Sequence, residues 1–312
     1  ILAEYIDSNG EQYSKQSMIQ EDIQRDCILP ENVTPTKKLI KTAENPQNIL
    51  LTGAGGFLGI YLLRELLKST NAKIYCLIRK GEFDTAAKRL LATINKFHLE
   101  NDVSLNDRRI IAIASDLSAD NFGLPVEQYN SLLEKIDLIY HCGAQVNIMA
   151  SYNKLRGSNV IGTLEVIKFA TTRYDKPIHY ISTLSSAYQK DAEGSLSEVF
   201  PEASYEELSG QATVALSLAH PLRSTVYHID HPAGIMWPDL IDWLNNYGYR
   251  VKLISIADWK KLLPTLPQDN ALFSFLPYYL AFPDDFEMTQ VSVAHATAEL
   301  TRLDLPYPLI DD

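Results

Sequence analysis

The chain has 312 residues, with 28 Lys and Arg against 39 Asp and Glu, which gives a formal net charge of −11. This length allows about two domains, and 46% hydrophobic with 21% charged residues is typical of a folded soluble protein. The negative charge argues against nucleic-acid binding, which needs a basic face. No apolar stretch is long enough to span a bilayer, and the first residues, ILAEYIDSNGEQ, lack signal-peptide features. Three cysteines without a C-x-x-C pair exclude a zinc ribbon and a disulfide framework, so we expect a reducing, cytoplasmic location.

Residues 1–47 differ from the rest of the chain. They are polar, contain Pro30, Pro35 and Pro46, and have no strand pattern. We interpret them as a leader or linker with some packed segments and a short helix around residues 17–27.

A regular alternation of elements begins at Asn48. Short apolar runs predict buried parallel strands at 49–51, 73–78, 109–114, 136–141 and 178–182. Helical periodicity predicts helices at 61–68, 85–97, 126–133 and 159–171. This alternation indicates an α/β fold with a Rossmann-type doubly wound parallel sheet over residues 48–230.

The pattern changes after Gln211. It predicts strands at 226–229 and 251–254, and helices at 237–247, 258–263 and 270–280. We therefore expect a smaller C-terminal mixed α/β domain over residues 231–312.

The strongest chemical motif is a glycine cluster between the first strand and the first helix. Its glycines follow the pattern G-x-x-G-x-x-G. Such a turn needs unusual backbone angles and lets a pyrophosphate approach without a Cβ in the way, and the helix N-terminus supplies free N–H groups. The predicted dinucleotide-binding residues here are Thr52, Gly53, Gly55, Gly56, Phe57, Leu58 and Gly59.

The end of the second strand indicates which dinucleotide is bound. An NAD site would place Asp or Glu there to hold the ribose 2′-hydroxyl, but this sequence has Arg79 followed by Lys80. A guanidinium suits a 2′-phosphate, and Arg89 on the next helix can add a second contact. We therefore expect NADPH rather than NADH.

Three further positions fit a bound nucleotide. Asp116 and Leu117 end the third strand, where an adenine edge would lie, and Gly143 and Ala144 follow the fourth strand. Asn159 begins the run NVIGT. Their order and spacing support one another.

These motifs together resemble a known family. The runs LLTGAGGFLG, YCLIR, SDL, GAQVN, NVIGT and YISTLSS are similar to the extended short-chain dehydrogenase/reductase superfamily. TGAGGFLG followed by YLLRELL, then IYCLIR, IDLIYHCGAQVN, HYISTLSS and the later WPDLIDWLNNYGY resemble one branch more narrowly. That branch is the thioester reductase (R) domain of nonribosomal peptide and polyketide synthetases and of carboxylic acid reductases. The resemblance runs from Asn48 to the C-terminus.

The resemblance implies a function. The family delivers hydride from NADPH to an acyl or peptidyl thioester on the phosphopantetheine arm of a carrier protein, giving an aldehyde and in some members an alcohol. Residues 1–47 would then follow a carrier domain, and residues 231–312 would face substrate and carrier. The chain would be a monomeric domain of a larger multidomain enzyme. Thr183 matches the family's catalytic hydroxyl.

One part of the family pattern is missing. The superfamily has Tyr-x-x-x-Lys after the fifth strand, but none of the 17 tyrosines has Lys four residues later. Tyr188 and Tyr205 lie nearest the right place, and Tyr152 has Arg156 but precedes that strand. We hypothesise that a block carrying the Tyr and Lys is absent at the Gly210/Gln211 junction, through deletion or disorder; an intact mass of 35.1 kDa would exclude a block hidden by disorder.

Two alternatives stay open. An extended epimerase or dehydratase acting on a nucleotide sugar would hold NAD and would favour an acidic residue in place of Arg79. A catalytically inactive NADP-binding scaffold would need no Tyr and Lys. The H-x-x-H pattern of His228 and His231 lies at a predicted strand end, where the two rings share no helical face, so we expect no metal site.

Overall fold

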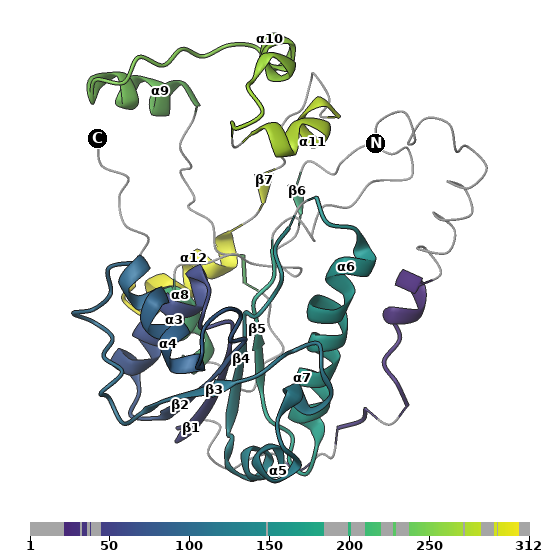
Figure 1. The fold of residues 1–312 in the computed structure, drawn as a ribbon. Helices are drawn as coiled ribbons and strands as arrows, with labels where there is room; N and C mark the ends of the chain where they lie inside the picture. Colours follow the sequence, from purple (N-terminus) through teal and green to yellow (C-terminus); the bar gives the residue numbers. More distant parts are fainter. Residues whose placement is uncertain are drawn as a thin grey trace. The chain divides into compact units, whose positions relative to one another are not determined.

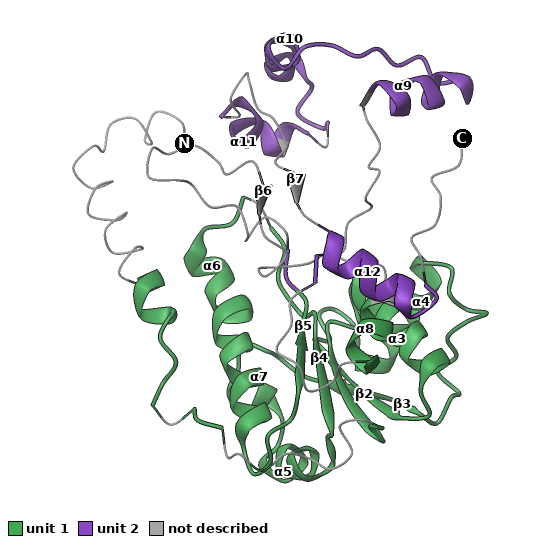
Figure 2. Ribbon diagram, turned by 180° about the vertical axis from the view of Figure 1, so that it is seen from behind, with its two compact units in different colours: residues 1–181, 209–223 green, residues 182–208, 224–312 purple. Residues whose placement is uncertain are grey.

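The computed structural model describes residues 22–31, 33–35, 38, 45–147, 149–183, 199–200, 210–219, 227–228, 237–270, 272–281, 290–291 and 293–305. The chain divides into two compact units (Figure 2). The first contains residues 1–181 and 209–223, and the second residues 182–208 and 224–312. The first unit holds the glycine cluster and is described in more detail.

A five-stranded parallel sheet forms the centre of the first unit, in the order β3-β2-β1-β4-β5. Its strands are β1 (Asn48–Thr52), β2 (Lys73–Ile78), β3 (Ile110–Ala114), β4 (Leu138–His141) and β5 (Ile178–Tyr180). The central strands are buried on both faces, which explains why they are continuous apolar runs in the sequence. The predicted doubly wound α/β fold is confirmed.

Helices cover both faces of this sheet (Figure 1). Residues of α3 (Phe57–Ser69), α4 (Ala86–Lys96) and α8 (Gly210–Ala219) pack in one apolar core, with Ile60, Leu90 and Val214 among its buried members. Residues of α5 (Val126–Lys135) and α7 (Gly162–Thr171) pack in the other, around Phe169. The two cores lie on opposite faces of the sheet, whose parallel strands bring their carboxyl ends to one edge.

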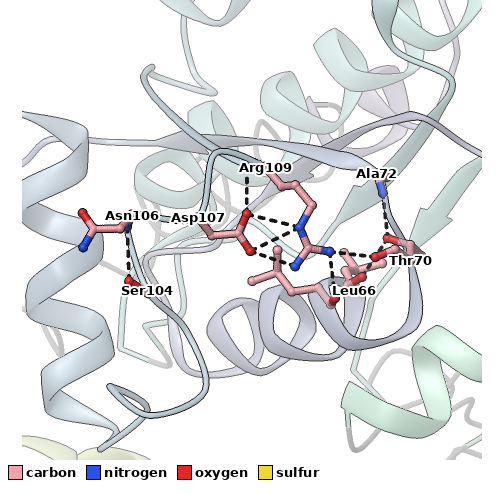
Figure 3. A network of polar contacts seen from close by, with 8 residues as sticks. Leu66, Thr70, Ala72, Ser104, Asn106, Asp107 and Arg109 are labelled. Carbon is pink, nitrogen blue, oxygen red and sulfur yellow. Dashed lines mark hydrogen bonds and ion pairs between the residues drawn. The ribbon is translucent and has the colours of Figure 1, made fainter.

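Arg109 joins the end of α3 to the start of β3 (Figure 3). Its Nη1 donates to the carbonyl oxygens of Leu67 and Thr70, at 2.9 and 2.8 Å. The Asp107 carboxylate accepts from Arg109 Nε at 3.2 Å and from Nη2 at 2.7 Å. Because the last carbonyls of a helix have no partner within it and carry partial negative charge, a guanidinium held there stabilises the helix end.

The helix after β4 starts earlier than the sequence predicts. It begins as α6 (Tyr152–Arg156), passes through one π turn (Gly157–Ile161) and continues as α7. The expected start at Asn159 was wrong because residues 152–158 are mostly polar and give no clear apolar periodicity. The π turn, a feature often found at functional sites, lies beside the ends of the strands.

The second unit is described in separate segments. It contains β6 (Val199–Phe200) paired in parallel with β7 (Gln290–Val291), and the helices α9 (Trp237–Asn246), α10 (Ile256–Leu262), α11 (Leu276–Leu280) and α12 (Ala294–Arg302). Short 3-10 turns lie at Asp120–Gly123 in the first unit and at Leu263–Thr265 and Phe273–Phe275 in the second. The helix expected at 270–280 is therefore only a 3-10 turn followed by the short α11.

The strand expected at 251–254 is not formed. Asn245 Oδ1 accepts from the Val251 N–H at 3.0 Å, and Asn245 Nδ2 donates to the Val251 carbonyl at 3.2 Å. Both backbone groups of Val251 are thereby occupied by a side chain instead of a neighbouring strand. Tyr227 and His228 are also not in a strand, and the rest of that predicted strand lies outside the described residues, as does His231.

Two further expectations meet the structure only in part. Residues 22–26 are helical, as predicted for 17–27, while residues 17–21 lie outside the described residues. Within the part of the chain that the structure describes, no helix is both long and apolar enough to cross a membrane.

Candidate functional site

The glycine turn brings the end of β1 against the start of α3. Gly53 has φ +78°, and a Cβ on it would lie 2.7 Å from the Gly143 nitrogen. A Cβ on Gly59 would lie 2.1 Å from the Gly53 carbonyl oxygen. In the described residues no side chain caps the start of α3, which follows Gly56 directly. The turn therefore presents bare backbone and a helix N-terminus to any ligand above it.

A pocket lies at the carboxyl ends of β1 to β4. It brings together most of the predicted nucleotide-binding residues: Gly53, Gly55, Gly56, Arg79, Arg89, Asp116, Leu117, Gly143 and Ala144. Other lining residues were not among the predicted site residues: Leu77, Ile78, Ser115, Cys142, Gln145 and Ser158. The structure does not place five of the predicted residues in this lining: Thr52, Phe57, Leu58, Gly59 and Asn159.

Two arginines form the positively charged side of the pocket. Arg89 Nη1 donates to the carbonyl oxygen of Arg79, so the helix α4 holds its guanidinium against the end of β2. A Cβ on Gly55 would lie 3.3 Å from Arg89 Nε, so the Arg89 guanidinium packs closely against the glycine turn. Burial and the charge of Arg79 both lower the pKa of Arg89. An anion bound here would relieve the repulsion between the two cations.

The loop after β3 is held by hydrogen bonds within the loop and by one from α7. Asp116 Oδ1 accepts from the backbone N and the Oγ of Ser118, at 2.9 and 2.6 Å, and these bonds together with the nearby charge of Arg79 lower the Asp116 pKa. Glu165 on α7 accepts from the Asn121 N–H at 3.0 Å. A Cβ on Gly162 would lie 3.0 Å from Leu117 Cβ. The glycine of NVIGT thus allows α7 to approach this loop closely.

Asn159 acts through the segment after β4. Its Oδ1 accepts from the Gln145 N–H at 2.7 Å, and its Nδ2 donates to the Gln145 carbonyl at 3.0 Å. Gln145 itself lines the pocket. Asn159 therefore fixes the backbone of a lining residue, a role that its place in the sequence did not indicate.

Cys142 is placed as a packing residue. Its Sγ donates to the Thr52 carbonyl at 3.1 Å, and burial raises the pKa of the thiol to about 12. A thiol with this pKa stays protonated at neutral pH and is a poor nucleophile.

The expected catalytic groups are less fully described. Thr183 follows the end of β5 and belongs to the second unit, and Tyr188 and Tyr205 lie outside the described residues. Tyr152 donates to Asp26 Oδ2, and burial with that carboxylate raises its pKa to about 12, which is unlike an activated phenol. At the junction where a block is expected, Gly210 and Gln211 are consecutive residues of α8. Ser217 of this helix contacts the Tyr140 hydroxyl at 2.6 Å, so α8 packs in the first unit without a Tyr-x-x-x-Lys pair.

The chain matches short parts of much longer proteins. It is 40% identical over 167 residues to a linear gramicidin synthase protein of Brevibacillus parabrevis, covering 53% of this chain and 3% of that protein. It is 31% identical over 219 residues to the carboxylic acid reductase of Segniliparus rugosus, covering 65% of this chain and 18% of that protein. The chain thus spans less than a fifth of the length of these two relatives.

Solved structures share the fold. The terminal R domain from the myxalamid PKS-NRPS biosynthetic pathway matches with a TM-score of 0.78 and 21% identity, over 94% of each chain. A thiolation-reductase di-domain from an archaeal non-ribosomal peptide synthetase matches with a TM-score of 0.64 and 24% identity, over 86% of this chain and 74% of that one. The predicted resemblance to R domains is confirmed for the fold. A family model described as Male sterility protein matches residues 51–233. Because this match covers more than half of the sequence, the chain belongs to that NAD-binding family.

Proposed function

We propose that this chain is an NADPH-dependent thioester reductase module, which releases a carrier-bound acyl or peptidyl group as an aldehyde and can reduce it further to an alcohol. The observation that carries the proposal is the pairing of Arg79 and Arg89 at one side of a pocket that begins at the glycine turn. The names of the relatives, among them a gramicidin synthase and a carboxylic acid reductase, support the reaction class.

The pocket residues fit a nicotinamide dinucleotide with a 2′-phosphate. The glycine turn and the start of α3 suit the pyrophosphate, because bare backbone and a helix N-terminus bind anions. Arg79 and Arg89 suit the 2′-phosphate, and Asp116 with Leu117 suit the adenine edge. Gly143, Ala144 and Gln145 continue the lining at the end of β4, where the ligand would pass toward the reacting group.

The bound NADPH would supply hydride to the thioester carbonyl carbon. As that carbonyl becomes tetrahedral, negative charge develops on its oxygen, and we assign Thr183 as a hydroxyl that donates to it. The oxygen takes up a proton to give the hemithioacetal. The C–S bond then breaks as the O–H proton leaves and the departing sulfur gains a proton, which gives the aldehyde and the free thiol of the phosphopantetheine arm. A second hydride and proton would give the alcohol.

The proposed partner is an acyl or peptidyl carrier protein within a cytoplasmic multidomain enzyme. The relatives are much longer than this chain, and one structural match is a thiolation domain joined to a reductase domain. In this arrangement residues 1–47 would connect to the carrier, residues 48–230 would bind the nucleotide and residues 231–312 would face the substrate.

A second candidate is a catalytically inactive NADP-binding scaffold. The observation that favours it is the absence of Tyr-x-x-x-Lys from the whole 312-residue sequence. NADPH oxidation with an acyl-CoA or an acylated carrier protein separates the two candidates. Turnover supports the reductase, and tight NADPH binding without turnover of either thioester supports the scaffold.

The cofactor assignment is tested by Arg79→Ala and Arg89→Ala. Each should weaken NADPH binding about 10- to 100-fold, the loss of a charge-assisted phosphate contact, and change NADH binding by less than about threefold. Dissociation constants for both nucleotides are measured by titration of the nicotinamide fluorescence.

Lys88→Ala is the matched control, because Lys88 is the neighbour of Arg89 on α4 but pairs with Asp84 on the exposed surface. It should leave both dissociation constants unchanged. Equal losses for NADPH and NADH in the arginine variants would contradict a 2′-phosphate site.

A further inference from the structure

A chain of hydrogen bonds runs behind the pocket through a buried histidine. Thr52 ends β1 and His141 ends β4, where the two residues pair in register. Thr52 Oγ1 lies 2.7 Å from His141 Nδ1, and His141 Nε2 lies 3.2 Å from Thr163 Oγ1 on α7. Thr52 is fully buried and His141 is only 2% exposed. Both ring nitrogens therefore find their partners inside the protein.

The two ends of this chain are backbone groups with fixed roles. The Gly143 N–H donates to Thr52 Oγ1 at 3.0 Å, and the Thr163 hydroxyl donates to the Asn159 carbonyl at 2.7 Å. An amide N–H can only donate, and a carbonyl oxygen can only accept. The directions of the bonds between them follow from these two ends.

Only one form of the imidazole satisfies every bond. Because the Thr163 hydroxyl donates its proton to the Asn159 carbonyl, its oxygen must accept from His141 Nε2–H. Nδ1 is then unprotonated and accepts from the Thr52 hydroxyl, whose oxygen accepts from Gly143. A proton on Nδ1 would leave the buried Thr52 hydroxyl without an acceptor, which is costly. Burial independently favours the uncharged ring and lowers the His141 pKa to about 4.

This chain connects three segments that line the pocket. Thr52 directly precedes Gly53, and His141 directly precedes Cys142 and Gly143. Thr163 on α7 bonds the Asn159 carbonyl in the π turn. The Asn159 side chain in turn binds both backbone groups of Gln145. The His141 ring is not itself among the lining residues. It joins the paired ends of β1 and β4 to α7 at the ligand-binding edge.

We infer that His141, as the neutral Nε2–H tautomer, is a positioning residue that holds the glycine turn, the end of β4 and the Asn159–Gln145 clamp in their nucleotide-binding geometry. The inference deepens the proposed function and rests on it. The hydrogen bonds of His141 involve neither Arg79 nor Arg89, so loss of the ring should weaken the binding of NADPH and NADH by the same factor. This distinguishes it from a residue that contacts the 2′-phosphate.

The first test is the tautomer, read from long-range ¹H–¹⁵N spectra of the wild-type chain at neutral pH. The His141 signals are assigned by their loss in His141→Phe. We expect an unprotonated Nδ1 and a protonated Nε2. A protonated Nδ1, or a doubly protonated ring, would overturn the inference whatever the variants do.

The second test is nucleotide affinity. His141→Phe should raise the dissociation constants of NADPH and NADH by the same factor, about tenfold, because the buried Thr52 hydroxyl loses its acceptor and the partly buried Thr163 oxygen loses its donor, which loosens the binding geometry. Thr163→Val, which removes both the acceptor of His141 Nε2–H and the donor to the Asn159 carbonyl, should act in the same direction, and Thr163→Ser should restore wild-type affinity. This pair keeps the test valid if His141→Phe does not fold.

His179→Phe is the matched control. His179 is another largely buried histidine on the adjacent strand β5, and its Nε2 has no hydrogen-bond partner among the described residues. This variant should leave both affinities unchanged. If the wild type binds nucleotide and the His141 and Thr163 variants bind it equally well, the positioning role alone is overturned. If the wild-type chain binds neither nucleotide, the proposed function and the positioning role are overturned together.

Discussion

Gly59 illustrates how a single missing methyl group shapes the site. Its Cα faces the Gly53 backbone so closely that a Cβ would lie 2.1 Å from the Gly53 oxygen and 2.5 Å from its carbonyl carbon. These are backbone atoms of the turn, so they cannot rotate away as a side chain can. The first turn of α3 therefore packs against the glycine turn with no room for a side chain at residue 59.

Gly59→Ala should damage the turn. We expect the free energy of unfolding to fall by about 1–3 kcal/mol, the cost of overpacking, and NADPH binding to be lost at concentrations that saturate the wild type. Urea unfolding and fluorescence titration measure the two effects.

Gly157→Ala is the control for that substitution. Gly157 is helical, and a Cβ on it would meet only Ser118 Cβ at 3.4 Å, an ordinary contact. Alanine there should leave stability unchanged or raise it by up to about 1 kcal/mol. If Gly59→Ala were equally harmless, the close approach at Gly53 would not be required.

The sequence indicated those site residues whose chemistry is local. A glycine pattern between strand and helix, or an arginine at a strand end, can be recognised from neighbouring residues alone. Gln145 and His141 could not, because their roles depend on Asn159 and Thr163, which the fold brings to them from the next helix. A lone buried histidine at a strand end gives no signal of the bonds at its two nitrogens.

At the scale of elements, an ion pair ties the segment at residues 22–26 to α6. Asp26 accepts from Arg156 Nε at 2.5 Å and from Nη2 at 2.7 Å, and the Tyr152 hydroxyl donates to the same carboxylate at 2.5 Å. The Asp26 side chain is 9% exposed. Because α6 leads directly into the π turn beside the pocket, this contact connects residues 22–26 to the site.

A double-mutant cycle with Asp26→Ala and Arg156→Ala should give a coupling energy of about 1–2 kcal/mol, as for a partly buried bidentate pair. Hydrogen exchange at residues 22–31 should accelerate in both single variants. The free energies come from urea unfolding of the four proteins.

The pair Asp84 and Lys88 serves as the comparison. It has the same charges, but both side chains are exposed, at 75% and 62%. Its coupling should be no more than about 0.5 kcal/mol. Equal coupling in the two cycles would mean that the Asp26 contact contributes no more than a surface pair.

Elements were predictable where the apolar period was long and undisturbed. The five strands of the sheet and the core-facing helices α3, α4, α5 and α7 follow such periods. The prediction failed at α6, whose polar residues hide the helix, and at residues 251–254, where the Asn245 side chain takes the backbone groups of Val251. In both places a tertiary or side-chain contact, not local preference, decides the structure.

At the scale of the whole molecule, buried histidines make stability depend on pH. Burial lowers the pKa values of His141 and His179 from 6.5 to about 4. Below pH 6.5 the unfolded chain binds protons that the folded chain does not, so the free energy of unfolding falls with falling pH. Each group contributes a slope of up to about 1.4 kcal/mol per pH unit between these two pKa values.

A second decline should follow at lower pH. Hydrogen bonds from Arg156 lower the Asp26 pKa from 3.8 to about 2, so its stabilising contribution is complete above pH 3.8 and is lost as the pH falls toward 2. Melting temperatures at closely spaced pH values should therefore show two regions of decline, the first between pH 6.5 and 4.

Single variants assign each region to its group. His179→Phe removes one titrating ring without removing a described hydrogen bond at Nε2, so the slope between pH 6.5 and 4 should become smaller while the lower region stays. Asp26→Asn should lower stability at neutral pH and flatten the region between pH 3.8 and 2, because the amide cannot titrate. An unchanged slope in His179→Phe would mean that this histidine is protonated in the folded chain, and the upper region would then have to arise from His141 alone or from groups outside the sheet.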